Sequence, residues 1–73
     1  MKNTLKFSVK VGDAVRMVDW NVGDLRVMEI FYIDGQPYAR LNGGDNPYIV
    51  HVADMVKCSA GWLVTYDDVT VVK

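Results

Sequence analysis

The residues best suited to catalysis in this 73-residue chain are its one histidine, His51, and its one cysteine, Cys58. His51 could act as a general base oriented by Asp54, but the pair would straddle a strand end, where nothing fixes their geometry. Cys58 follows Lys57, whose charge favours a thiolate, yet a cysteine at a strand end usually behaves as a small apolar residue. The sequence therefore predicts no catalytic residue.

Metal ligands are equally scarce. A zinc site needs about four cysteine or histidine ligands at short spacing, and the chain offers one of each. Asp67 and Asp68 are adjacent, so they would point to opposite faces of a strand or be solvated in a tight turn. We expect neither a metal ion nor another cofactor.

The glycine-bearing stretch DGQPYARLNGGDNPYIVHV, residues 34–52, could instead hold a phosphate. A phosphate-binding loop leads from a strand through its glycines into a helix, with a lysine close behind. Here Pro47 and another strand-like run follow the second group of glycines. Asp34 and Gly35 lie between two strand-like runs, which is a strong hairpin signal. Both glycine-bearing segments are therefore predicted to be turns between strands.

Aromatic residues are the strongest indication of a binding surface. Trp20 lies in the polar loop DWNVGD, where such a large ring suggests a binding anchor, unless it folds back as a plug over the open end of the fold. If the following strands pair regularly, one outward face carries Tyr38, Arg40, Ile49 and His51. Rings beside an arginine can stack on a base or another planar ligand, but the same face could be half of a subunit interface. The predicted ligand-binding residues are Trp20, Tyr38, Arg40, Tyr48 and His51.

The elements that must position these residues are strands. Valine, isoleucine and aromatic residues dominate the ordered-looking segments, and no window shows sustained helical periodicity. Turn signals recur every eight to twelve residues, which is typical of a small antiparallel barrel or sandwich. The predicted strands are 5–9, 14–19, 25–33, 37–41, 48–52, 62–66 and 69–72, with one 3₁₀ turn at 53–56.

The third of these strands, with the sequence RVMEIFYI, has apolar side chains on both faces. A β-bulge near Met28 and Glu29 would place Val27 and Ile30 on the core face and bend the strand. The alternative is a strand covered on both sides, with a partner subunit over one face.

Size and composition favour self-association. A chain of this length buries only about 60% of its unfolded surface, and a single cysteine excludes an intrachain disulfide. The apolar fraction of 51% is generous for so short a chain. We expect a homodimer or a larger homo-oligomer.

Charge says less about partners. Residues 1–26 hold five Lys and Arg against three Asp. Residues 27–73 hold three Lys and Arg against six Asp and Glu. This distribution lacks the basic excess of most nucleic-acid-binding domains, although the fold could gather Lys6, Lys10, Arg16 and Arg40. We therefore expect the ligand to be either a protein or a single-stranded nucleic acid.

No apolar run is long enough to span a membrane or to form the core of a signal peptide, and a single cysteine fits the cytoplasm.

Several segments together resemble the SH3-like small barrel: VGDAVRM, the long strand, DGQPYARL, YIVHV and the short turn ADMVKC. VGD-V followed by a V--I strand is similar to the openings of KOW-type modules and of small uncharacterised bacterial families. The resemblance implies one all-β domain over residues 1–73, an SH3-like antiparallel barrel of five to seven strands. Residues 9–58 would form the barrel, and residues 61–73 an extra C-terminal hairpin or an edge strand.

VGDAVR and VHVADMV also resemble type II dihydrofolate reductases, whose active site lies in the pore of a homotetramer. In place of that family's VQIY pore stretch, this chain has YIVH, with His51 at the tyrosine position and no glutamine. We favour a non-catalytic, oligomeric binding module over two alternatives. These are a pore-type reductase and a structural accessory subunit of a phage or mobile element.

Overall fold

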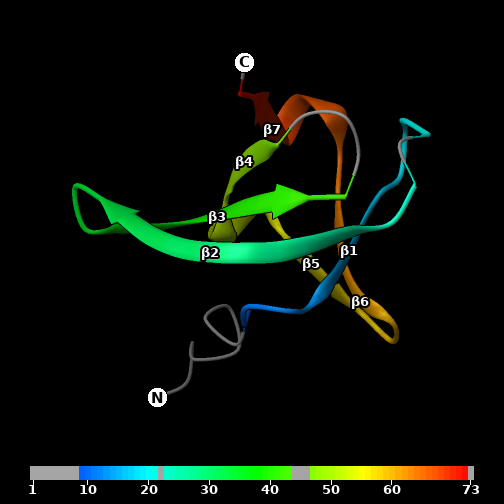
Figure 1. The fold of residues 1–73 in the computed structure, drawn as a ribbon, viewed down its shortest axis with the longest axis horizontal. Helices are drawn as coiled ribbons and strands as arrows, with labels where there is room; N and C mark the ends of the chain where they lie inside the picture. Colours follow the sequence, from blue (N-terminus) through cyan, green and yellow to red (C-terminus); the bar gives the residue numbers. More distant parts are fainter. Residues whose placement is uncertain (1–8, 22, 44–46, 73) are drawn as a thin grey trace.

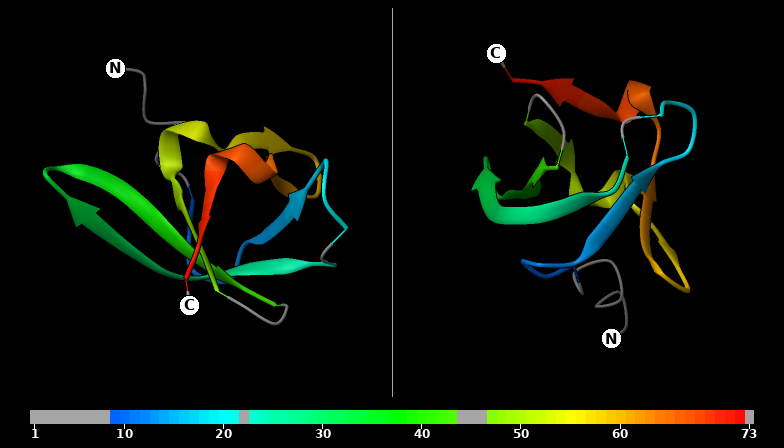
Figure 2. Two further views of the ribbon diagram at one scale, coloured as in Figure 1. Left: turned by 90° about the horizontal axis from the view of Figure 1, so that it is seen from above. Right: turned by 45° about the vertical axis from the view of Figure 1, so that its right-hand side comes forward.

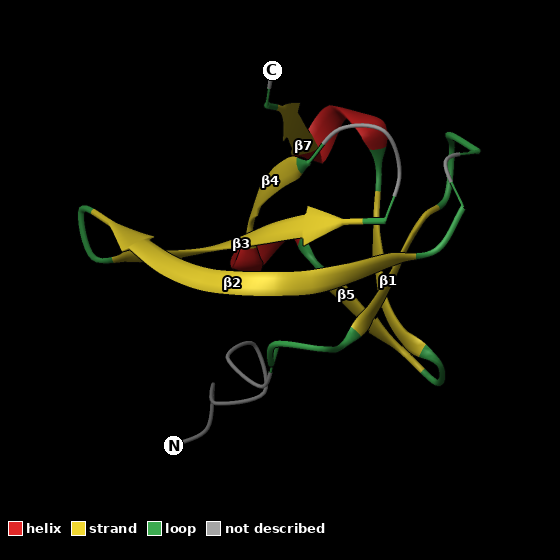
Figure 3. Cartoon of the chain, in the orientation of Figure 1, coloured by secondary structure: helices red, strands yellow, loops and turns green. Residues whose placement is uncertain are grey.

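The computed structural model of the chain describes residues 9–21, 23–43 and 47–72, which form one curved sheet (Figures 1 and 3). Its strands are β1 (Ala14–Met17), β2 (Leu25–Ile33), β3 (Gln36–Asn42), β4 (Tyr48–His51), β5 (Val56–Cys58), β6 (Gly61–Val64) and β7 (Val69–Val71). The 3₁₀ turn η2 (Val52–Asp54) follows β4, and η3 (Tyr66–Asp68) joins β6 to β7. The strand order is β5-β6-β1-β2-β3-β4-β7, so β5 and β7 are the two ends of a sheet that does not close. The predicted all-β fold is confirmed.

The hairpin of β2 and β3 turns at Asp34 and Gly35. Both residues have positive φ, 52° and 80°, as a two-residue type I′ turn requires. β3 in turn pairs antiparallel with β4. The glycine-bearing stretch therefore connects strands, as predicted, although its residues 44–46 lie outside the described residues.

The predicted bulge in β2 is also confirmed. The register between β2 and β3 shifts between Val27 and Glu29, which leaves Met28 as the extra residue. Val27 is completely buried, and Ile30 packs against the core from the same strand. The bulge bends β2 around the core, which the long curved strand in Figure 1 shows.

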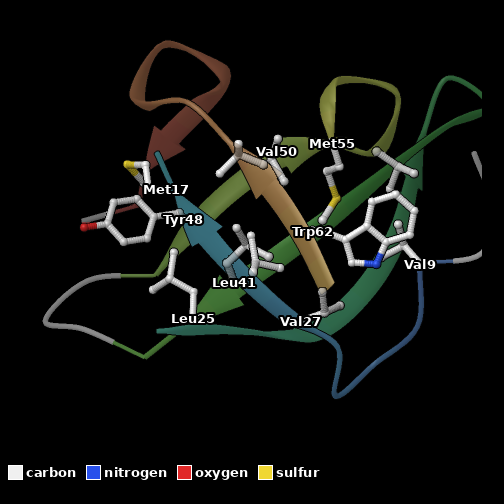
Figure 4. Close-up of a cluster of buried hydrophobic side chains, with 13 residues drawn as sticks. Val9, Met17, Leu25, Val27, Leu41, Tyr48, Val50, Met55 and Trp62 are labelled. Atoms are coloured by element: carbon white, nitrogen blue, oxygen red, sulfur yellow. The ribbon is translucent and has the colours of Figure 1, made fainter. Parts of the chain in front are cut away.

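Thirteen buried apolar side chains form the core inside this curve (Figure 4). They are Val9, Val15, Met17, Leu25, Val27, Ala39, Leu41, Tyr48, Val50, Val52, Met55, Trp62 and Val64. The indole Nε1–H of Trp62 donates to Oδ2 of Asp13, 3.1 Å away, so the polar edge of this large ring is satisfied.

The C-terminal segment does not form the expected extra hairpin. β6 pairs in parallel with β1 and antiparallel with β5, whereas β7 pairs with β4 at the far end of the sheet. Trp62 and Val64 of β6 lie in the core, and the edge-strand alternative holds for β7 alone. The turn η3 separates the two strands because Oδ2 of Asp68 accepts the Thr65 N–H at 3.1 Å and starts a helical turn.

Other boundaries differ from the prediction near the 3₁₀ turns. η2 begins one residue earlier than predicted, and the short strand β5 follows it where the sequence indicated only a turn. Of the expected strand 5–9, only Val9 lies within the described residues, and it is buried without belonging to a strand. No helical segment of the described chain is long and apolar enough to cross a membrane.

Gly61 allows the close approach of β6 to β1. Its φ is 143°, and a Cβ at this position would collide with the carbonyl oxygen of Ala14. Gly12 also has a positive φ, 97°, but no atom lies within 4 Å of where its Cβ would be. We expect Gly61→Ala to lower the free energy of unfolding by about 1–3 kcal/mol more than Gly12→Ala does. Urea unfolding followed by circular dichroism tests this, and equal losses would show that β6 does not lie so close to β1.

Candidate functional site

The predicted outward face exists on β3 and β4. Tyr38 pairs with His51, and Arg40 pairs with Ile49, so the four side chains share the side of the sheet away from the core. All four are half-buried.

β2 extends this face with a third ring. Phe31 lies opposite Tyr38, with ring centroids 6.0 Å apart, and the His51 ring meets Tyr38 edge-on at 4.8 Å. We call Phe31, Tyr38 and His51 the aromatic row. Beside it, Nε of Arg40 forms an ion pair with Oε1 of Glu29 at 3.2 Å, so the arginine is already partly engaged within the sheet.

His51 is a structural residue here. Its Nδ1 accepts the backbone N–H of Ala53 at 3.0 Å, which caps η2. Because Nδ1 accepts, the ring proton belongs on Nε2, which donates to Oε1 of Gln36 at 3.1 Å. Ala53 and Gln36, rather than Asp54, therefore orient the ring. A general base would need one of these two nitrogens to be free.

Tyr48 is not part of this face. Its side chain is only 6% exposed and lies in the core with Leu25 and Met17 around it (Figure 4). Because strand residues alternate, Tyr48 must point inward when Ile49 and His51 point outward. Its assignment as a ligand-binding residue is corrected by this burial.

Trp20 lies at a different surface. Its side chain is 54% exposed, so it does not plug the end of the fold. The ring packs instead on Tyr66, itself 43% exposed, with centroids 5.1 Å apart and planes tilted by 34°. The five residues predicted to bind a ligand thus divide among the outward face, the core and this exposed pair.

The parallel pairing of β1 with β6 brings Trp20 and Tyr66 together. It places η3 beside the loop that follows β1, as two views show (Figure 2). The Tyr66 N–H donates to Oδ1 of Asp19 at 2.8 Å, and the Val18 N–H donates to the Val64 carbonyl at 2.9 Å. Two segments far apart in sequence are therefore fixed next to each other.

An apolar groove adjoins this pair. Val56 of β5 lies opposite Leu63 of β6, and these two side chains with Val18 line a hollow of about 180 Å³. We define the apolar groove by Val18, Val56 and Leu63; Asp54 and Asp68 also line the hollow. A larger and more polar hollow of about 620 Å³ lies along the loop that carries Trp20, and it shares Val18 with the groove.

Other reactive groups do not gather at either surface. Within the described ranges, no three side chains of the His, Cys, Asp and Glu types lie close enough together to hold a metal ion. Cys58 is a half-buried free thiol at the end of β5. Comparison of the chain with protein-family models, with curated proteins and with solved structures gave no match.

Sequence reasoning did not identify Tyr66 or the groove residues. It continued a strand through Tyr66, whereas Thr65 and Asp68 have the spacing of a cap at the start of a helical turn. That signal would have ended the strand at Thr65. The groove depends on the pairing of β1 with β6, for which no local pattern exists.

The exposure of Trp20 has a direct consequence for stability. We expect Trp20→Ala to lower the free energy of unfolding by about 1 kcal/mol or less, since the ring is mainly in solvent. Trp62→Phe should cost about 1–3 kcal/mol, because it leaves the partly buried Asp13 carboxylate without its indole donor. Urea unfolding of both variants, followed by circular dichroism, makes the comparison. A larger loss for Trp20→Ala would mean that its ring is a plug after all.

Proposed function

We propose that the protein is a non-catalytic interaction module that binds a polypeptide through Trp20, Tyr66 and the apolar groove. The observation that carries this proposal is the exposed aromatic pair, whose two segments are joined by hydrogen bonds from the backbone N–H groups of Tyr66 and Val18. A large apolar side chain left in water forgoes about 1.5–3 kcal/mol of burial, and a bound partner would recover part of it. The meander of β2, β3 and β4 followed by η2 supports placing the module among SH3-like barrels.

The charges around this surface favour protein over nucleic acid. Among the described residues, the charged side chains that line the two hollows are those of Asp19, Asp24, Asp54 and Asp68 against that of Arg16. These carboxylates would repel a phosphate backbone.

Catalysis has less support, because His51 uses both ring nitrogens within the fold. The free thiol of Cys58 fits a module of a reducing compartment such as the cytoplasm.

Self-association is a second proposed function, and the aromatic row favours it. Three rings and Ile49 lie side by side on the outer face of β2, β3 and β4. The Glu29–Arg40 pair makes this face nearly neutral, so two copies can meet across a two-fold axis without net repulsion. Such a homodimer would leave the Trp20 surface open to a partner.

Selection of peptides from a random display library tests binding at the Trp20 surface. Peptides selected on the wild-type protein should bind the Trp20→Ala/Tyr66→Ala variant at least about tenfold more weakly, as expected for truncated anchor residues. Tyr32→Ala is the matched control, because Tyr32 is 67% exposed and lies outside this surface. Equal binding to wild type and the double variant would contradict the proposal. Trp20-dependent binding of an oligothymidylate would show that the ligand is nucleic acid instead.

Sedimentation equilibrium at micromolar concentration tests self-association. We expect a mass above that of the 8.2 kDa monomer, and we expect Tyr38→Glu to restore the monomer by burying a charge at the interface. Tyr32→Glu adds the same charge to a more exposed tyrosine outside the row and should leave the mass unchanged. A wild-type monomer would exclude the dimer.

A further inference from the structure

We infer that the segment bound in the apolar groove is an extended, cationic polypeptide of another protein, with apolar side chains between lysines or arginines. This inference rests on the proposed function and names the partner's chemistry. It is carried by the groove's apolar lining, by the carboxylates at the groove and the hollow next to it, and by the exposed ring pair nearby.

The groove suits a large apolar side chain. Val18 and Val56 are 56% and 61% exposed, and with Leu63 they form the apolar part of its lining. An apolar cavity of about 150 Å³ is large enough to bind benzene, so a hollow of about 180 Å³ can hold one leucine or phenylalanine side chain. Val18 also borders the Trp20 hollow, so a longer segment could continue from the groove to the ring pair.

The carboxylates make this apolar surface selective for positive charge. Asp54 and Asp68 line the groove itself, and Asp19 and Asp24 line the hollow next to it. Arg16 lines the same hollow as Asp19 and Asp24 and lies opposite Leu63, so one guanidinium offsets part of the charge of these four carboxylates and the balance stays negative. The one ion pair among the described residues joins Arg40 to Glu29 on the outward face. Asp19 and Asp68 each accept one backbone N–H, which leaves their charge in place. Their summed field attracts lysine and arginine side chains.

The same charges select against other occupants. A second copy of this chain in the groove would bring its own acidic surface against this one, and like charges across an interface are unfavourable. The faces of Trp20 and Tyr66 add a favourable site for a cation, since an aromatic ring attracts lysine or arginine placed over it.

Two short synthetic peptides test this inference by isothermal titration calorimetry. One alternates lysine with leucine and valine, and in the other each lysine is replaced by glutamate. We expect the lysine peptide to bind, its affinity to fall about fivefold between 50 and 300 mM salt, and the glutamate peptide not to bind.

Matched variants locate the binding site. Val56→Lys should weaken binding of the lysine peptide at least about tenfold, whereas Val11→Lys should not, because Val11 is equally exposed at 64% but lies outside the groove. Asp54→Asn should weaken binding about two- to threefold, and Asp34→Asn, with the same change of charge at the distant β2–β3 turn, should not.

Three kinds of result would overturn the inference. The first kind comes from the calorimetry: the two peptides bind equally, or Val56→Lys has no effect on the lysine peptide. The second is a set of library peptides that depend on Trp20 but lack lysine and arginine, which would leave the proposed function intact. The third is a wild-type oligomer that Val56→Lys converts to a monomer, since the occupant would then be a second copy. If no peptide of any charge depended on Trp20, the proposed function would fail as well.

Discussion

The parallel pairing of β1 with β6 supports both the core and the exposed aromatic pair. An aspartate anchors it at each end: Asp13 accepts the Trp62 indole N–H at 3.1 Å, and Asp19 accepts the Tyr66 backbone N–H at 2.8 Å. At the Asp13 end the backbone of β6 lies so close to the Ala14 carbonyl that only glycine fits at position 61. One end of this pairing thus seats Trp62 in the core, and the other fixes η3 beside Trp20.

The sheet that results has two outer surfaces with different electrostatic character. The aromatic row lies beside a balanced Glu29–Arg40 pair, whereas aspartates surround the groove and the Trp20–Tyr66 pair. A nearly neutral face tolerates a second copy of itself, and an acidic apolar face favours a cationic partner. Self-association and partner binding can therefore use different sides of the same small domain.

Local patterns predicted the features that depend on neighbouring residues. The break in apolar alternation along β2 indicated the bulge near Met28, and the Asp34-Gly35 pair indicated the hairpin turn. Strand alternation also predicts that Tyr48 faces the core when His51 faces outward, and its burial agrees with this alternation. The place of β6 beside β1 could not be predicted, because a contact across 47 residues, such as that of Tyr66 with Asp19, leaves no local periodicity.

The indole N–H signals of the two tryptophans test the central claim most directly. In a ¹H–¹⁵N spectrum one signal reports the environment of the exposed Trp20 ring, and the other reports the indole N–H of Trp62 that is hydrogen-bonded to Asp13. On titration with a peptide that the protein binds, we predict that the Trp20 signal moves while the Trp62 signal stays in place. Movement of the Trp62 signal with a static Trp20 signal would contradict the claim that the exposed pair is the binding surface.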